Sequence, residues 1–267
     1  MAIDLSGVRA KIERAREHRD ALEAEIEPVL REERDPIQLS AKLDSDSGYH
    51  VFRVAVMPDR WLLRVAVILG DIVHNLRSAL DLLAWQLVLN YYGRPKTEEH
   101  RRLVKFPIEQ KRSSVTSSYT YSKVSPADRA DIEWAQPYYA PNFPTRFRRV
   151  PKLHTLATLH RFSNRDKHRV LNPILIRTGN ILFHGTPFEG VAPADIKATR
   201  LDKSLKVGTE VAQGLYPSHV DDEVEVAGYV TPDIRLPQGG YSPVNGVDLM
   251  ANAVEVVVER FAKRYGV

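Results

Sequence analysis

The sequence contains no cysteine, so disulfide bonds, thiolate nucleophiles and thiolate-ligated metals are all excluded. It also has no H-E-x-x-H metal motif, no glycine-rich phosphate loop and no G-x-S-x-G elbow. The first residues, MAIDLSGVRAKIERAREHRD, are charged and lack the apolar core of a signal peptide. We therefore expect a cytoplasmic protein that needs neither a metal nor a cofactor.

A long uninterrupted apolar segment is also missing. The one candidate for a membrane span, residues 65–91, is interrupted by Asp71, His74, Arg77 and Asp81. Ionisable groups inside a span are rare because their burial in lipid is costly. This segment is therefore expected to be buried in protein, with no membrane association.

The chain has 267 residues, of which 43% are hydrophobic, enough for a sizeable core. Apolar residues at helical spacing predict four main helices and one short helix. The main helices are expected at residues 5–33, 58–93, 152–169 and 243–265, and the short one at residues 125–136. Ser125–Pro126 and Ser242–Pro243 each resemble a helix N-cap followed by proline at the first helical position.

Strand patterns occur both early and late in the chain. Residues 37–43 and 49–56, joined by DSDSG, predict a hairpin, and residues 172–178 and 180–184 predict another. Residues 223–230 form a further strand candidate, whereas the Ser/Thr/Tyr tract at residues 113–122 is expected to be a loop. The fold class is therefore α+β: about four long helices packed with an antiparallel sheet built from early and late strands. Because the early strands need the late ones to complete a sheet, we expect a single domain over residues 1–267.

The central helix carries a polar inset in an otherwise apolar sequence. Its apolar face is formed by Leu69, Ile72, Val73, Leu76, Ala79, Leu80 and Leu83. His74, Arg77, Ser78 and Asp81 fall together on the opposite face. Such groups are costly to bury without partners, so this inset marks a place where polar contacts are made.

A second inset lies in the helix expected at residues 152–169. Leu153, Leu156, Leu159 and Val170 would form its apolar face. The opposite face would carry His154, Thr158, Arg161, Arg165 and His168. Residues 144–169 hold eight Lys or Arg against one acid, Asp166, which suggests attraction to a phosphate-bearing ligand or simply a solvated basic face.

The two insets carry complementary charges. Asp81 is expected to pair with Lys167 or Arg165, and Asp166 with Arg77. One interpretation is a purely structural clamp between two helices. The other is a shared cleft in which histidines exchange protons and arginines hold a phosphate.

Three motifs resemble those of a widespread, uncharacterised bacterial family. They are HNLRSALD at residues 74–81, F-P-I at residues 106–108 and N-x-D-K-H-R at residues 164–169. The resemblance covers about the middle half of the chain. It implies a shared fold and transfers no activity.

The spacing of Arg161, six residues and then His168 also resembles the motif of the HEPN ribonucleases. In that family the arginine and histidine cleave RNA without a metal, in a cleft formed by a dimer. The chain departs from the family in having Phe162 after the arginine, where a polar residue is usual, and in having strands.

The leading hypothesis is a metal-independent endoribonuclease, or another nucleic-acid-acting protein, of toxin or phage-defence type. His168 would be the acid or base, Arg161 the phosphate clamp, and His74, Arg77 and Asp81 the orienting groups. The residues expected to contact the substrate are Asn164, Arg165, Asp166, Lys167 and Arg169. The expected partners are RNA, or another phosphate-bearing ligand, and a second copy of the chain.

Two alternatives stay open. The protein is a non-catalytic dimeric binding or scaffold module whose insets clamp helices together, or it is a small-molecule enzyme or sensor that binds an anionic ligand between the helices.

Overall fold

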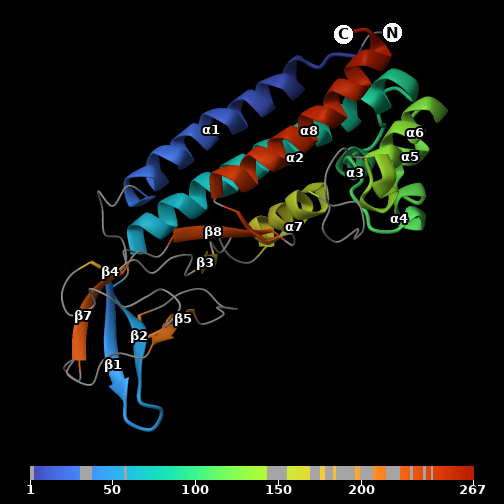
Figure 1. Ribbon diagram of the computed structural model, residues 1–267. Helices are drawn as coiled ribbons and strands as arrows, with labels where there is room; N and C mark the ends of the chain where they lie inside the picture. The colour runs from blue at the N-terminus through green and yellow to red at the C-terminus, as the bar shows by residue number, and fades with distance from the viewer. Residues whose placement is uncertain are drawn as a thin grey trace.

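The computed structural model has a mixed helix and sheet architecture, as predicted (Figure 1). It describes residues 3–30, 38–56, 59–142, 155–168, 175–177, 183–184, 196–198, 207–214, 223–228, 231–236, 239–241 and 243–267. Three long helices lie side by side, a group of short helices covers one end of them, and strands lie toward the other end. The first and last described residues lie together at the end that carries the short helices.

Four main helices form the bundle, in agreement with the predicted number. They are α1 (Ser6–Leu30), α2 (Asp59–Tyr91), α7 (Thr155–His168) and α8 (Pro243–Tyr265). Helix α2 packs against each of the other three. Its predicted apolar face is buried: Leu69, Ile72, Val73, Leu76, Ala79, Leu80 and Leu83 are all at most 1% exposed. The hydrophobic core therefore centres on α2.

Local sequence signals set the helix ends. Gly93 adopts a left-handed φ of 86°, and its N–H donates to the Val88 carbonyl oxygen, which closes the last turn of α2. Helix α6 (Pro126–Trp134) begins after Ser125, whose hydroxyl accepts from the N–H of Asp128. Proline occupies the first position of both α6 and α8, as predicted.

The strands combine early and late parts of the chain, as the sequence predicted. β1 (Gln38–Asp44) and β2 (Tyr49–Val56) form the expected hairpin. The six-stranded antiparallel sheet has the order β4-β7-β1-β2-β6-β5. Its other strands are β4 (Phe183–His184), β5 (Ile196–Ala198), β6 (Glu210–Gly214) and β7 (Glu223–Gly228).

The predicted hairpin at residues 172–184 is wrong. β3 (Leu175–Arg177) pairs with β8 (Thr231–Leu236), which in turn pairs with β9 (Gly239–Tyr241). β4 instead pairs with β7 in the larger sheet. Residues 175–177 and 183–184 are strands, but each pairs with a strand in a distant part of the chain.

The Ser/Thr/Tyr tract also differs from its prediction as a loop. It forms α4 (Arg112–Thr116) and α5 (Tyr119–Ser122), after α3 (Glu98–Leu103). The Ser118 hydroxyl caps α5 by accepting from the Tyr121 N–H, and Val115 and Thr120 are fully buried. A side-chain cap and buried anchors thus order a polar segment, which continues through α6 to the 3₁₀ helix η1 (Pro137–Asn142).

None of the helices in the described ranges combines the length and apolar character needed to cross a lipid bilayer.

Candidate functional site

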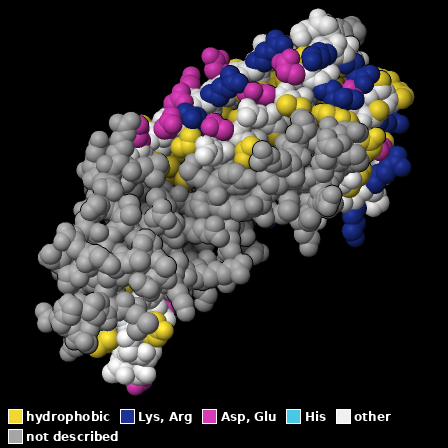
Figure 2. Space-filling model, viewed as in Figure 1, with side chains coloured by type: hydrophobic (Ala, Val, Ile, Leu, Met, Phe, Trp, Pro, Cys, Tyr) yellow, Lys and Arg dark blue, Asp and Glu magenta, His cyan; other side chains and the backbone are white. Residues whose placement is uncertain are grey.

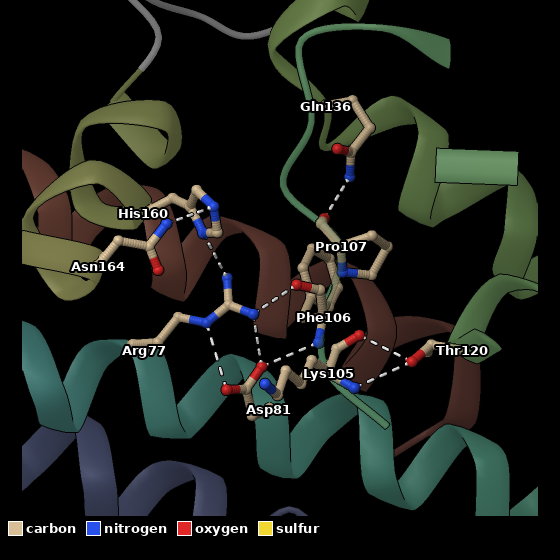
Figure 3. A network of polar contacts seen from close by, with 9 residues as sticks. All are labelled: Arg77, Asp81, Lys105, Phe106, Pro107, Thr120, Gln136, His160 and Asn164. Atoms are coloured by element: carbon tan, nitrogen blue, oxygen red, sulfur yellow. Dashed lines mark hydrogen bonds and ion pairs between the residues drawn. The ribbon is translucent and has the colours of Figure 1, made fainter. Parts of the chain in front are cut away.

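The polar inset of α2 binds the backbone of one residue in the F-P-I segment (Figure 3). Arg77 donates through Nη2 to the Phe106 carbonyl oxygen at 2.7 Å. The N–H of Phe106 donates to Asp81 Oδ1 at 2.9 Å. Arg77 also forms an ion pair with Asp81, at 2.8 Å between Nη2 and Oδ1. Both backbone polar groups of Phe106 are therefore satisfied by one ion pair, and its side chain is fully buried.

Neighbouring peptides of this segment are held in the same way. Thr120 Oγ1 accepts from the Lys105 N–H at 3.0 Å and donates to the Lys105 carbonyl oxygen at 2.8 Å. Gln136 donates to the Pro107 carbonyl oxygen and accepts from the Glu109 N–H. Since Thr120 and Gln136 are fully buried, these contacts replace water for an extended segment that joins no sheet.

Helix α7 meets this network through His160. Its Nδ1 lies 3.5 Å from Arg77 Nη1, and its Nε2 lies 3.0 Å from the Asn164 amide (Figure 3). The contact between Arg77 and His160 joins the two polar insets, since α2 carries one and α7 the other. Helix α7 thus contacts the α2 inset through a histidine that was not among the predicted site residues.

The ion pairs predicted between the insets involve Arg165, Asp166 and Lys167, whose side chains lie outside the described residues, so these pairs remain predictions. Within the described residues, Asp81 pairs with Arg77 of its own helix. The described contacts of Arg77 are with Asp81, Phe106 and His160. An arginine and an aspartate four residues apart are neighbours on one helix face, so the local pair forms without help from α7.

His74, the other predicted α2 residue, lies apart from this network. It is exposed, and its Nε2 is 3.5 Å from the Ser78 hydroxyl. Among the contacts of the described residues, none joins His74 to Arg77 or Asp81.

The predicted polar face of α7 is partly buried. Leu156, Leu159 and Phe162 point into the core, and Thr158 is buried beside them, although we expected it on the polar face. Arg161 and Asn164 are exposed, and the Arg161 guanidinium carbon lies 5.9 Å from the Phe162 ring centroid. The exposed edge of α7 is therefore rotated relative to the predicted face.

Several predicted residues lie partly or wholly outside the described part of the chain. His154 and Arg169 are outside it altogether, and only the backbone of α7 is described at positions 165–168. The predictions for Arg165, Asp166, Lys167, His168 and Arg169 remain predictions.

His160 could have been found from the sequence. It precedes Asn164 by four residues, a spacing that places two side chains side by side on a helix. The position of Arg77 opposite His160 could not have been predicted from the sequence, because it depends on the rotation of α7 about its own axis.

No group of three His, Asp or Glu side chains is arranged to hold a metal ion in the portion that the structure describes. No family model matches the chain, and neither the curated proteins nor the solved structures include a significant match.

Proposed function

We propose that the protein cleaves RNA, or acts on a similar phosphate-bearing chain, at the exposed edge of α7 without using a metal ion. His168 is the acid or base in this proposal, and Arg161 holds the phosphate. Asn164, Arg165, Asp166, Lys167 and Arg169 contact the substrate.

The single observation that carries the proposal is the continuity of α7 from Thr155 to His168. An α-helix repeats about every 3.6 residues, so positions 161 and 168 fall on nearly the same face. Positions 160 and 164 lie within about 100° of them. In this proposal, the phosphate-binding Arg161 thus shares one edge of α7 with three residues that exchange protons or form hydrogen bonds. These are His160, Asn164 and His168.

The chemistry fits an RNA substrate because the 2′-hydroxyl is a nucleophile built into the chain. A histidine that removes its proton allows the oxygen to attack the adjacent phosphorus. The bond to the 5′ oxygen then breaks, that oxygen takes a proton from solvent, and the histidine returns to solvent the proton that it removed. An arginine offsets the negative charge on the phosphoryl oxygens during this exchange. The products carry a 2′,3′-cyclic phosphate and a 5′-hydroxyl.

Arg77 and Asp81 act as positioning residues in this proposal. Asp81 orients Arg77, and Arg77 touches His160, which borders the proposed edge. His74 keeps its predicted orienting role, although it lies on an exposed part of α2. A cytoplasmic location and a homodimer that completes the cleft belong to the same proposal.

The test is incubation of labelled single-stranded RNA with the pure protein in EDTA. His168→Ala and Arg161→Ala are expected to lower the rate at least about 100-fold. His100→Ala and Arg102→Ala, both exposed on α3, are the matched controls and keep full activity. Intact RNA, or a His168→Ala protein as active as the His100→Ala control, contradicts the proposal. Light scattering reports whether the active species has twice the chain mass of 30.3 kDa.

A non-catalytic binding or scaffold module is the second candidate. The observation that favours it is the full engagement of Arg77 and Asp81 by the Phe106 backbone, which is the arrangement of a structural clamp. A scaffold module of this kind predicts that Asp81→Ala lowers the free energy of unfolding. It also predicts that the wild-type protein leaves RNA intact.

A further inference from the structure

An open pocket of about 690 Å³ lies between α6 and α8, at the end of the bundle that carries the short helices. Asp131 and Trp134 of α6 line one side, and the α8 side is formed by Val256, Glu259, Arg260, Lys263 and Arg264. Its volume lies within the range of small-ligand sites. Lys and Arg side chains are gathered over this helical end of the molecule (Figure 2).

Two arginines of the pocket are held by one buried carboxylate. Arg260 donates through Nε to Asp131 Oδ1 at 2.6 Å, and Arg264 donates through Nε to Asp131 Oδ2 at 2.5 Å. Asp131 is 1% exposed, whereas the two arginine side chains are 40% and 34% exposed. The Arg260 guanidinium also lies 4.3 Å above the Trp134 ring. Both guanidinium groups are therefore held through Nε by the buried Asp131, and both are partly exposed to solvent at the pocket.

Each arginine uses only its Nε–H in this contact. Among the described residues, their terminal Nη groups donate no hydrogen bond, and Lys263 between them has no ion-pair partner. The pocket holds three cations, Arg260, Lys263 and Arg264, against the carboxylates of Asp131 and Glu259, so one positive charge is in excess. Asp131 is buried, and each of its carboxylate oxygens accepts a hydrogen bond from one arginine Nε–H.

We propose that this pocket binds the phosphate group of a phosphorylated ligand, either a free nucleotide or the phosphate of an RNA strand. The planar Nη1/Nη2 edge of a guanidinium matches two phosphate oxygens, and two such edges beside an ammonium group suit a dianion. Pre-orientation by Asp131 lowers the entropy lost when the arginines bind. Val256 and Trp134 offer apolar contact to the rest of the ligand.

The proposal is independent of RNA cleavage at α7, because none of the pocket residues belongs to that helix. A failure at one site therefore leaves the other proposal unaffected. The carboxylate-held arginine pair would also stabilise the contact between α6 and α8, so the test must separate binding from stability.

The experiment is calorimetric titration of the full chain with inorganic phosphate, adenosine monophosphate, and a short RNA with either a 5′-phosphate or a 5′-hydroxyl. Lys263→Glu is the main variant, because Lys263 is exposed and its replacement breaks no described contact. It should weaken phosphate binding at least about tenfold, since it removes one charged hydrogen bond and adds repulsion. Arg264→Lys retains a cation for Asp131 but loses the planar edge, and it should weaken binding as well.

Lys96→Glu is the matched control, since Lys96 is exposed and outside the pocket. Binding of the nucleotide but not of RNA identifies a free ligand as the source of the phosphate, and a preference for the 5′-phosphorylated RNA identifies a strand end. An absence of heat with all four probes up to about 10 mM overturns the proposal. The proposal is also overturned if Lys263→Glu and Lys96→Glu weaken phosphate binding equally, because the effect then reflects net charge alone.

Discussion

Arg77 and Asp81, one turn apart on α2, bind opposite sides of the same residue, Phe106: the arginine takes its carbonyl oxygen and the aspartate its N–H. The arrangement resembles the pairing that a neighbouring strand would supply, although the partner here is a helix. It explains what an arginine and an aspartate do in the largely apolar helix α2. It also accounts structurally for two of the three motifs noted in the sequence, HNLRSALD and F-P-I.

Removing the carboxylate is expected to destabilise the fold strongly. Asp81→Ala leaves the Arg77 charge, 7% exposed, without its counter-ion and the Phe106 N–H without an acceptor. Breaking a buried ion pair on one side costs about 3–5 kcal/mol, and the partial exposure of Asp81 places the expected loss near about 3 kcal/mol. Urea denaturation measures the free energy of unfolding. Asp71→Ala, on an exposed position of the same helix, should change it by less than about 0.5 kcal/mol.

A second prediction concerns Gln136, whose amide holds the end of the same segment. Gln136→Leu leaves the Pro107 carbonyl and the Glu109 N–H without these partners in the interior. Buried groups left unsatisfied cost about 1–3 kcal/mol each, so a loss of about 2–3 kcal/mol is expected. The matched control is Gln110→Leu at an exposed position. Equal effects of the two substitutions would show that the hydrogen bonds contribute little.

The elements predicted correctly are those whose cause is local. The buried face of α2 follows from apolar spacing, the β1–β2 hairpin from alternation around DSDSG, and the start of α6 from Ser125 and Pro126. Each depends on residues close together in the chain, so the sequence carries the information directly.

The hairpin predicted at residues 172–184 was wrong because strand pairing depends on residues far away in the chain. The sequence around β3 and β4 is typical of a hairpin, yet β3 pairs with β8 and β4 pairs with β7. The contact between Arg77 and His160 likewise depends on how α7 is rotated against α2. By contrast, the pair of Arg77 with Asp81 has the i, i+4 spacing of a helical ion pair and was predictable.

Tyr265 should make stability fall at alkaline pH. Burial, together with its hydrogen bond to Asp128, raises the pKa of Tyr265 from 10.0 to about 12. The folded state therefore keeps this proton after the unfolded chain has lost it, and the contribution to stability disappears as pH rises from about 10 to about 12. Thermal melts across this pH range should show a smaller decline of the melting temperature for Tyr265→Phe than for the wild type. The melting temperature of Tyr91→Phe, a substitution at an exposed position, should decline as steeply as that of the wild type.

The last prediction concerns the protonation of His160. Arg77 can only donate hydrogen bonds, so the Nδ1 atom that faces it must be the acceptor, and the proton of the neutral ring belongs on Nε2. The structure places Asn164 Nδ2 at 3.0 Å from Nε2, and two N–H donors cannot share a hydrogen bond, so the Asn164 amide has to turn round and present its oxygen. We expect ¹⁵N NMR of the imidazole to report the Nε2–H form, with His160→Asn identifying the signal. Asn164→Ala should leave this tautomer unchanged, since Arg77 sets it. A dominant Nδ1–H form would mean that Arg77 and His160 do not interact, and would remove the proposed role of Arg77 in positioning the edge of α7.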